Sequence, residues 1–175
     1  AQLEATVQQK IAIAKNAKDE TLNWDEELAK IKGGLVGISA DAAGTYPEIE
    51  ALKTKVAANP QDTDAIYKLA QAYQDIKNWN GAILTWQKMI TLLPTWEPAY
   101  YSQGYAYQQA GSKELAAGAY QKYIDTLMAK PAADQEANKE TMSYAYFAMA
   151  FIAKDSDKEK AKANVAKSLA LNPTY

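Results

Sequence analysis

The stretch "TDAIYKLAQAYQDIKNWNGAILTWQKMITLLP", Thr63 to Pro94, decides the fold because its landmarks return 34 residues further along the chain. The aromatic positions show this interval: Tyr73 is followed by Tyr107, and Trp86 is followed by Tyr120. The same interval links Pro60 to Pro94, Ala82 to Ala116 and Lys88 to Lys122. A fixed period of this length indicates a stack of repeated structural units.

A 34-residue period with Leu, small, Tyr, Ala and Pro landmarks resembles the tetratricopeptide repeat (TPR). In the first unit, Leu69, Ala70 and Tyr73 match the first helix of that pattern, and Ala82 and Pro94 match the second. The resemblance implies two antiparallel helices per unit. We therefore expect an all-α fold, a short TPR-type helical solenoid preceded by an N-terminal helical segment.

Three units and one extra helix can be placed in residues 46–175. The units run over about residues 63–96, 97–128 and 141–174, and a capping helix at 46–60 precedes them. The second unit departs from the pattern at Gln103, where Leu is usual, and at Met128, where Pro is usual. About ten residues are inserted before the third unit, and Pro131 marks the break. Phe147 and Phe151 take first-helix packing positions in the third unit.

Residues 1–45 do not match the repeat and are predicted to be a separate helical extension. Leu3, Val7 and Ile11 recur every four residues, which predicts a helix with a narrow apolar stripe. A second helix is predicted at residues 19–34, where two consecutive glycines end it. We expect this extension to cap the repeats or to dock on a neighbouring molecule.

The composition argues against several kinds of function. All 19 basic residues are Lys, and 21 Asp and Glu leave a net charge of −2, whereas nucleic-acid binding needs a concentrated basic face. His and Cys are both absent, so the chain has no thiol nucleophile, no imidazole base and no Cys/His ligand for zinc or haem. We therefore expect no enzyme activity, no cofactor and no metal site.

The location of the protein is predicted from two weaker features. No apolar run approaches the roughly 18–20 residues of a membrane-spanning helix. The sequence begins at Ala1 and not at Met, which is typical of a chain whose signal peptide has been removed. We expect an exported protein, either periplasmic or extracellular, with a cytoplasmic location as the alternative.

The tyrosine-rich stretch at residues 96–111 is interpreted from helical periodicity. Tyr100 and Tyr107 share a face with Gly104, at the packing positions of the repeat, so we predict that they lie in the core. Tyr101 and Tyr105 lie about 100° around the helix, on the face that lines the concave groove of a TPR solenoid.

This groove is predicted to bind a partner protein or peptide. Its expected lining is uncharged: Tyr67, Gln71, Gln74, Tyr101, Tyr105, Gln108 and Met149. TPR proteins that capture carboxyl-terminal tails use Lys, Arg and Asn at the matching places, so such a clamp is absent. A neutral aromatic groove favours an apolar helix or extended segment, and Tyr is enriched at protein interfaces. The leading hypothesis is a non-enzymatic interaction scaffold.

A second hypothesis is self-assembly, in which the partner is another copy of the chain. The terminal helices of a solenoid expose faces that pack against a neighbouring unit elsewhere in the stack. The last predicted helix carries the apolar residues Val165, Leu169 and Leu171. Leu3, Val7 and Ile11 are predicted to dock on Val165 and Leu169 of a neighbour. Such a head-to-tail contact builds a ring or a filament.

A third hypothesis comes from the sequence around Pro60. A short helix ending in "ANP" and followed by a repeat resembles the soluble domain of cytochrome c maturation factors. That resemblance implies a periplasmic accessory domain that binds the tails of apocytochromes. The absence of His and Cys means that haem would not be ligated by this chain.

Overall fold

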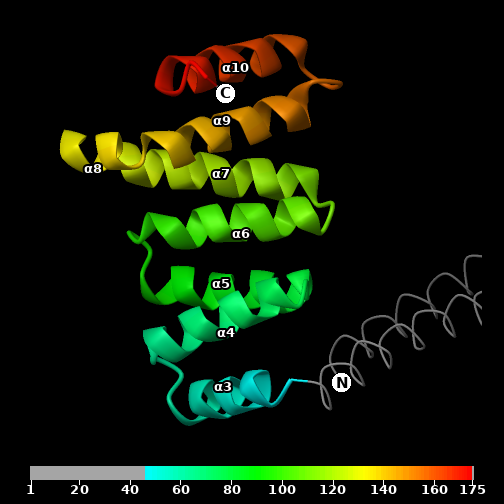
Figure 1. Ribbon diagram of the computed structural model, residues 1–175, viewed down its shortest axis with the longest axis vertical. Helices are drawn as coiled ribbons and strands as arrows, with labels where there is room; N and C mark the ends of the chain where they lie inside the picture. The colour runs from blue at the N-terminus through cyan, green and yellow to red at the C-terminus, as the bar shows by residue number, and fades with distance from the viewer. Residues whose placement is uncertain (1–45, 175) are drawn as a thin grey trace, which may run out of the picture. The chain divides into compact units, whose positions relative to one another are not determined.

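The computed structural model describes residues 46–174, which form eight α-helices and, within this range, no strand. The helices are stacked in chain order, with the first and the last at opposite ends (Figure 1). The contacts divide the chain into two units, Ala1–Pro47 and Glu48–Tyr175. The predicted stripe of Leu3, Val7 and Ile11 lies outside the described residues.

Three antiparallel helix pairs make up the stack. They are α4 (Thr63–Asp75) with α5 (Trp79–Leu92), α6 (Glu97–Gln109) with α7 (Lys113–Met128), and α9 (Lys139–Ala153) with α10 (Lys158–Leu171). A lone helix, α3 (Pro47–Ala58), precedes the first pair, and a short helix, α8 (Ala132–Ala137), lies in the insertion before the third. The fold is therefore the all-α helical solenoid that the repeat predicts.

Polar side chains cap the starts of both helices of the first pair. Asp62 caps α4 by accepting a hydrogen bond from the Ala65 backbone N–H at 2.9 Å. Asn78 caps α5 in the same way through the N–H of Gly81, also at 2.9 Å. These side chains satisfy backbone donors that would otherwise lack partners in the first turn.

The turns inside the first two pairs share one backbone conformation. Lys77 has φ 58° between α4 and α5, and Gly111, 34 residues later, has φ 79° between α6 and α7. Positive φ costs a residue with a side chain more than it costs glycine. The turn geometry is thus set by the repeat, and a lysine adopts it in the first unit.

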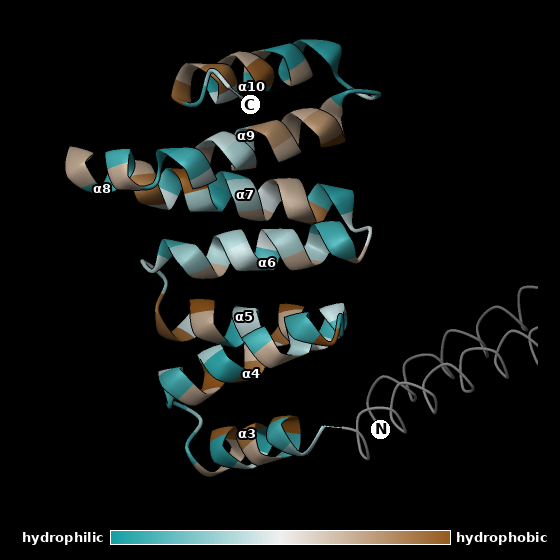
Figure 2. Ribbon diagram, in the orientation of Figure 1, coloured by the Kyte–Doolittle hydropathy of each residue, from teal (hydrophilic) through white to brown (hydrophobic). Residues whose placement is uncertain are grey.

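The core forms two clusters that meet near α6. The first contains Ile49, Leu52 and Val56 of α3 together with buried residues of α4 and α5, so α3 packs on the first pair. The second contains buried residues of α7 and α9, and Tyr100 packs against both clusters. Figure 2 shows that α9 is hydrophobic over much of its length. A helix that is hydrophobic on more than one face is stable in water only when other helices pack against those faces.

The insertion before the third pair is tied to the second pair. Glu97, which is buried at the start of α6, forms an ion pair with Lys130 after α7. The side chain of Gln135 in α8 donates a hydrogen bond to the Lys130 carbonyl at 2.8 Å. These contacts hold the extra residues against the stack.

Within the part of the chain that the structure describes, no helix combines the length and the apolar character needed to cross a bilayer.

Candidate functional site

The residues predicted for the groove lie on the first helices of the first two pairs, at equivalent places. Tyr67 in α4 is followed by Tyr101 in α6 after 34 residues, and Gln71 is followed by Tyr105 after the same interval. Corresponding side chains therefore recur from one helix pair to the next.

The Tyr67 ring is held at this surface by aromatic contacts. It lies edge-on to Trp86, with ring centroids 5.7 Å apart, and edge-on to Trp96, at 5.8 Å. The amide of the exposed Gln71 donates a hydrogen bond of 2.8 Å to the Tyr67 hydroxyl. Tyr67 and Trp96 also border a hollow of about 240 Å³. This end of the predicted groove is fixed in shape.

The two glutamines Gln74 and Gln108 have a packing role that their sequence position did not reveal. The Gln74 side-chain oxygen accepts a 2.7 Å hydrogen bond from the indole N–H of Trp86. The Gln108 side-chain oxygen accepts one of 2.8 Å from the hydroxyl of Tyr120. Both donors lie twelve residues later, on second helices, and both rings are buried. Each glutamine thus satisfies a polar atom that burial would otherwise leave unpaired.

Tyr101 and Tyr105 differ in their surroundings. Tyr101 lies within a cluster of tyrosine rings, with centroid distances of 5.8 Å to Tyr120, 5.3 Å to Tyr123 and 6.0 Å to Tyr144. Tyr105 lies edge-on to Trp79 at 6.0 Å. Both are half-buried, so each exposes part of its ring.

The predicted division of the tyrosines into core and groove is not sharp. Tyr100 and Tyr107 pack against the core, but they are half-buried, as Tyr101 and Tyr105 are. Tyr100 also donates a hydrogen bond to the Pro94 carbonyl at 3.0 Å. A half-buried ring can pack inward and present an edge outward at the same time, so periodicity alone did not separate the two roles.

The prediction that Met149 lines the groove is wrong. Its side chain is 3% exposed and lies in the second core cluster with Met142 and Ala145. The physical reason is that α9 packs against both α7 and α10, which buries two of its faces. A partner cannot reach Met149 in this arrangement.

Tyr120 and Tyr123 stay neutral at physiological pH. Burial raises the pKa of Tyr120 well above its usual value and raises the pKa of Tyr123 to about 12. Among the described residues, no group of three or more His, Cys, Asp or Glu is arranged to hold a metal ion. The surface offers uncharged aromatic edges and amides, which is the chemistry of noncovalent recognition.

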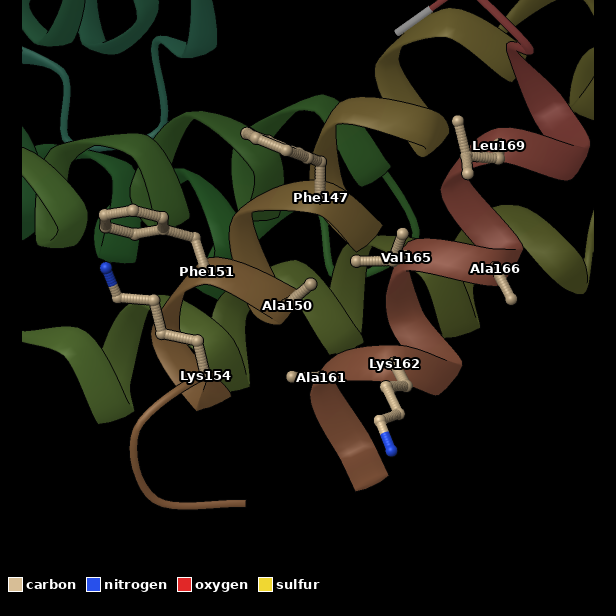
Figure 3. Close-up of a pocket in the computed structure, with 9 residues that line it drawn as sticks. All are labelled: Phe147, Ala150, Phe151, Lys154, Ala161, Lys162, Val165, Ala166 and Leu169. Carbon is tan, nitrogen blue, oxygen red and sulfur yellow. The ribbon is translucent and has the colours of Figure 1, made fainter. Parts of the chain in front are cut away.

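A second candidate surface lies on the face of the third pair that no described helix covers, and we call it the end face. It is a hollow of about 500 Å³ whose apolar lining includes Phe147, Phe151, Val165 and Leu169, with Lys154 and Lys162 beside them (Figure 3). The exposed fractions of the four apolar side chains run from 40% to 54%. Val165 and Leu169, predicted for self-docking, therefore lie on an exposed surface.

Phe147 and Phe151 are exposed, although both occupy first-helix places of the repeat. Their repeat positions are packing positions, and Gln103, the equivalent of Phe147 in the second unit, is 5% exposed. Gln103 is covered because its own helix lies between two others. Among residues 46–174, no helix follows α10, so the same positions in α9 remain open. The place of this pair as the last unit in the described array is the feature from which this exposed surface could have been predicted.

This architecture defines a helical-repeat solenoid, a class of protein whose units contact only their neighbours. The tetratricopeptide repeat family model matches residues 64–95 and 98–126, which are the first two helix pairs. Residues 64–95 and 98–126 are therefore tetratricopeptide repeats. A comparison with curated proteins gave no significant match.

Solved structures share this fold. The C-terminal part of a TPR repeat-containing protein from Cytophaga hutchinsonii is similar at 26% identity and a TM-score of 0.64, over 81% of this chain and 55% of that one. The chain thus spans about half the length of that structure. MamA from Desulfovibrio magneticus RS-1, residues 41 to the end, is similar at 19% identity and a TM-score of 0.58, over 99% of this chain and 95% of that one. A further MamA structure gives 21% identity and a TM-score of 0.60. The likeness to MamA concerns the fold.

Proposed function

We propose that the protein is an interaction scaffold that binds an apolar helix or extended segment along the first helices of its repeats. The observation that carries this proposal is the recurrence of half-buried aromatic rings at equivalent places, Tyr67 on α4 and Tyr101 on α6, each fixed by ring contacts. Rings already held in place lose little entropy on binding. Tetratricopeptide repeats are in general interaction modules, which supports a partner that is a protein.

The chemistry of the surface narrows the kind of partner. Gln71 and Tyr105 occupy equivalent places and carry no charge, and the places of a carboxylate clamp hold Tyr67, Gln71 and Tyr101. An acidic carboxyl terminus would find no cation there. A segment with apolar side chains and backbone polar groups fits better, because rings supply area and amides supply hydrogen bonds.

A matched pair of variants tests this surface. Proteins captured from the source cells by the intact chain are compared with those captured by Gln71→Ala/Tyr105→Ala and by Leu84→Ala/Leu115→Ala. Leu84 and Leu115 are 73% and 56% exposed on the second helices, so they control for the loss of exposed side chains elsewhere. We expect the first variant to lose its partner, with an affinity loss on the order of 2–4 kcal/mol for a hot-spot pair. Equal capture by all three chains, each with native circular dichroism, would refute the assignment.

Self-association is a second candidate function, and the end face favours it. Phe151, Val165 and Leu169 expose about half of their side chains on one hollow, and such apolar surfaces mark interaction sites. One candidate for the apolar counterpart on a neighbouring copy is the predicted stripe at Leu3, Val7 and Ile11. Sedimentation velocity over a concentration series tests this candidate: growth of the sedimentation coefficient with concentration supports it, and a monomer throughout rejects it.

Export and the cytochrome c maturation hypothesis stay predictions. Capture of an apocytochrome carboxyl-terminal peptide by the chain would support the latter, and the absence of binding would remove it.

A further inference from the structure

The end face is equivalent to surfaces of the first and second helix pairs that are buried by the next helix in the stack. Leu169 is equivalent to Ile90 of the first pair and Ile124 of the second, and these two are 8% and 2% exposed. Ile90 shares a core cluster with Ala99 and Ala106 of α6, and Ile124 shares one with Met142 and Met149 of α9. In both cases the first helix of the next pair supplies the cover.

From this, we propose that the end face binds residues 19–32 of a second copy of the chain, folded as a helix that packs there as α6 packs on the first pair and α9 packs on the second. The proposal rests on the self-association proposed above and names the segment that mediates it.

The first argument for this segment is its pattern. In α6, the residues that face the preceding pair are Ala99, Gln103 and Ala106, which are buried and spaced at i, i+4 and i+7. Gln103 contacts that pair directly, since its amide donates a 3.0 Å hydrogen bond to the side chain of Gln87. Residues 19–32 present Trp24, Leu28 and Ile31 at the same spacing. On a helix these three residues form one apolar stripe.

The second argument is charge. Both charged residues that line the end face are lysines, Lys154 and Lys162. The Lys154 ammonium lies 4.1 Å from the centre of the Phe151 ring, and Lys162 pairs with the exposed Glu159 at 2.9 Å. Residues 19–32 contain five carboxylates and two lysines, whereas residues 1–18 contain one carboxylate and three lysines. Opposite charge at the rim therefore selects residues 19–32 over the earlier stripe.

Charge also argues against the symmetric alternative, in which two end faces meet. That contact would bring Lys154 and Lys162 of one copy against the same lysines of the other, and like charges at an interface are unfavourable. The donor segment also precedes α3, and α3 and α10 lie at opposite ends of the described stack (Figure 1). Each copy would give one segment and receive one, which produces a ring or an open filament.

Helical spacing places four of the five carboxylates of the segment in two groups, one beside the apolar stripe and one opposite to it. Glu20 and Glu27 flank the stripe of Trp24, Leu28 and Ile31, whereas Asp19 and Glu26 lie on the opposite side of the helix. The proposal therefore requires Glu20 and Glu27, and not Asp19 and Glu26, to approach the lysines of the end face.

Charge reversal in the full chain tests this assignment by sedimentation. Lys154→Glu/Lys162→Glu is expected to weaken self-association at least about tenfold, and Glu20→Lys/Glu27→Lys by a similar factor. Combining the four substitutions restores opposite charge across the contact, so association should return to within about threefold of the original. Asp19→Lys/Glu26→Lys makes the same change in net charge on the opposite side and should leave association unchanged.

The outcomes separate the two proposals. A chain that stays monomeric at all concentrations overturns both. Association that survives Lys154→Glu/Lys162→Glu and also Val165→Glu/Leu169→Glu, with native circular dichroism, overturns the end face as its site. Association that is lost in Leu3→Asp/Val7→Asp but kept in Glu20→Lys/Glu27→Lys assigns the docking to the earlier stripe, which refutes this inference and leaves self-association standing.

Discussion

The side-chain oxygen of Gln108 accepts a 2.8 Å hydrogen bond from the hydroxyl of Tyr120, and the pair repeats the contact of Gln74 with Trp86 one unit earlier. In each of the first two units an amide on the first helix holds a buried aromatic ring on the second. The contact locks the two helices of a pair together and fixes the ring next to the surface that we assign to partner binding.

Removing the amide should therefore cost stability. Gln108→Ala leaves the buried Tyr120 hydroxyl without its acceptor, and we expect the free energy of unfolding to fall by about 1–3 kcal/mol. Urea denaturation measures the change. In a Tyr120→Phe background the same substitution should cost clearly less, since no hydroxyl is left unpaired; an equal cost in both backgrounds would contradict this account.

A pair of glycines tests how closely the helices approach. A Cβ atom built at Gly104 would lie 2.9 Å from the Tyr120 ring, whereas one at Gly118 meets nothing within 4 Å. Gly104→Ala should thus lower the free energy of unfolding by about 1–3 kcal/mol through overpacking. Gly118→Ala, in the middle of α7, should raise it by roughly 0.5–1 kcal/mol. Thermal unfolding followed by circular dichroism compares the two, and the same sign for both would be inconsistent with this packing.

Met149 should affect folding and not recognition. Truncation of this buried side chain in Met149→Ala leaves a cavity between α9 and its neighbours, for which we expect a loss of about 2–5 kcal/mol. Affinity for a captured partner, measured well below the melting temperature of the variant, should stay unchanged. Weaker binding by a fully folded Met149→Ala would restore Met149 to the binding surface.

The buried tyrosines predict loss of stability at alkaline pH. The pKa of Tyr123 is about 12 in the folded chain against 10.0 when exposed, because burial disfavours the phenolate, and the pKa of Tyr120 is raised for the same reason. Their contribution is fully present below pH 10 and is lost as the pH rises from 10 towards 12, at up to about 1.4 kcal/mol per pH unit for each group. Urea denaturation at increasing pH should show this decline, and Tyr123→Phe should make it shallower. A free energy of unfolding that rises across this window would contradict the burial of both phenols.

Much of the architecture followed from the 34-residue interval. Periodicity predicted the solenoid and assigned packing positions to Leu69 and Ala82, which are buried. It could not assign the roles of Gln74 and Gln108, since a hydrogen bond to an indole or a hydroxyl depends on where the second helix places its ring. The distance between the glutamine side chain and that ring cannot be predicted from the sequence of one helix.

The errors concern the third pair, where the array changes. Met149 was predicted to be open because its repeat position faces a groove, but α9 has neighbours on two sides. The repeat pattern placed Phe147 and Phe151 on the first helix of the third pair, and it did not indicate their exposure, because no described helix follows that pair. Whether a position is buried depends on which helices pack against it in space. The periodicity of a single helix gives no information about those neighbours.

The shared turn at Lys77 and Gly111 bears on how such a chain can lengthen. Since both turns have positive φ at the same place in the repeat, tandem duplication of residues 63–96 would insert a unit that keeps the turn inside its own helix pair. Growth by duplication would move the terminal hollow outward without altering its residues, so the length of the array and the chemistry of its tip can evolve independently.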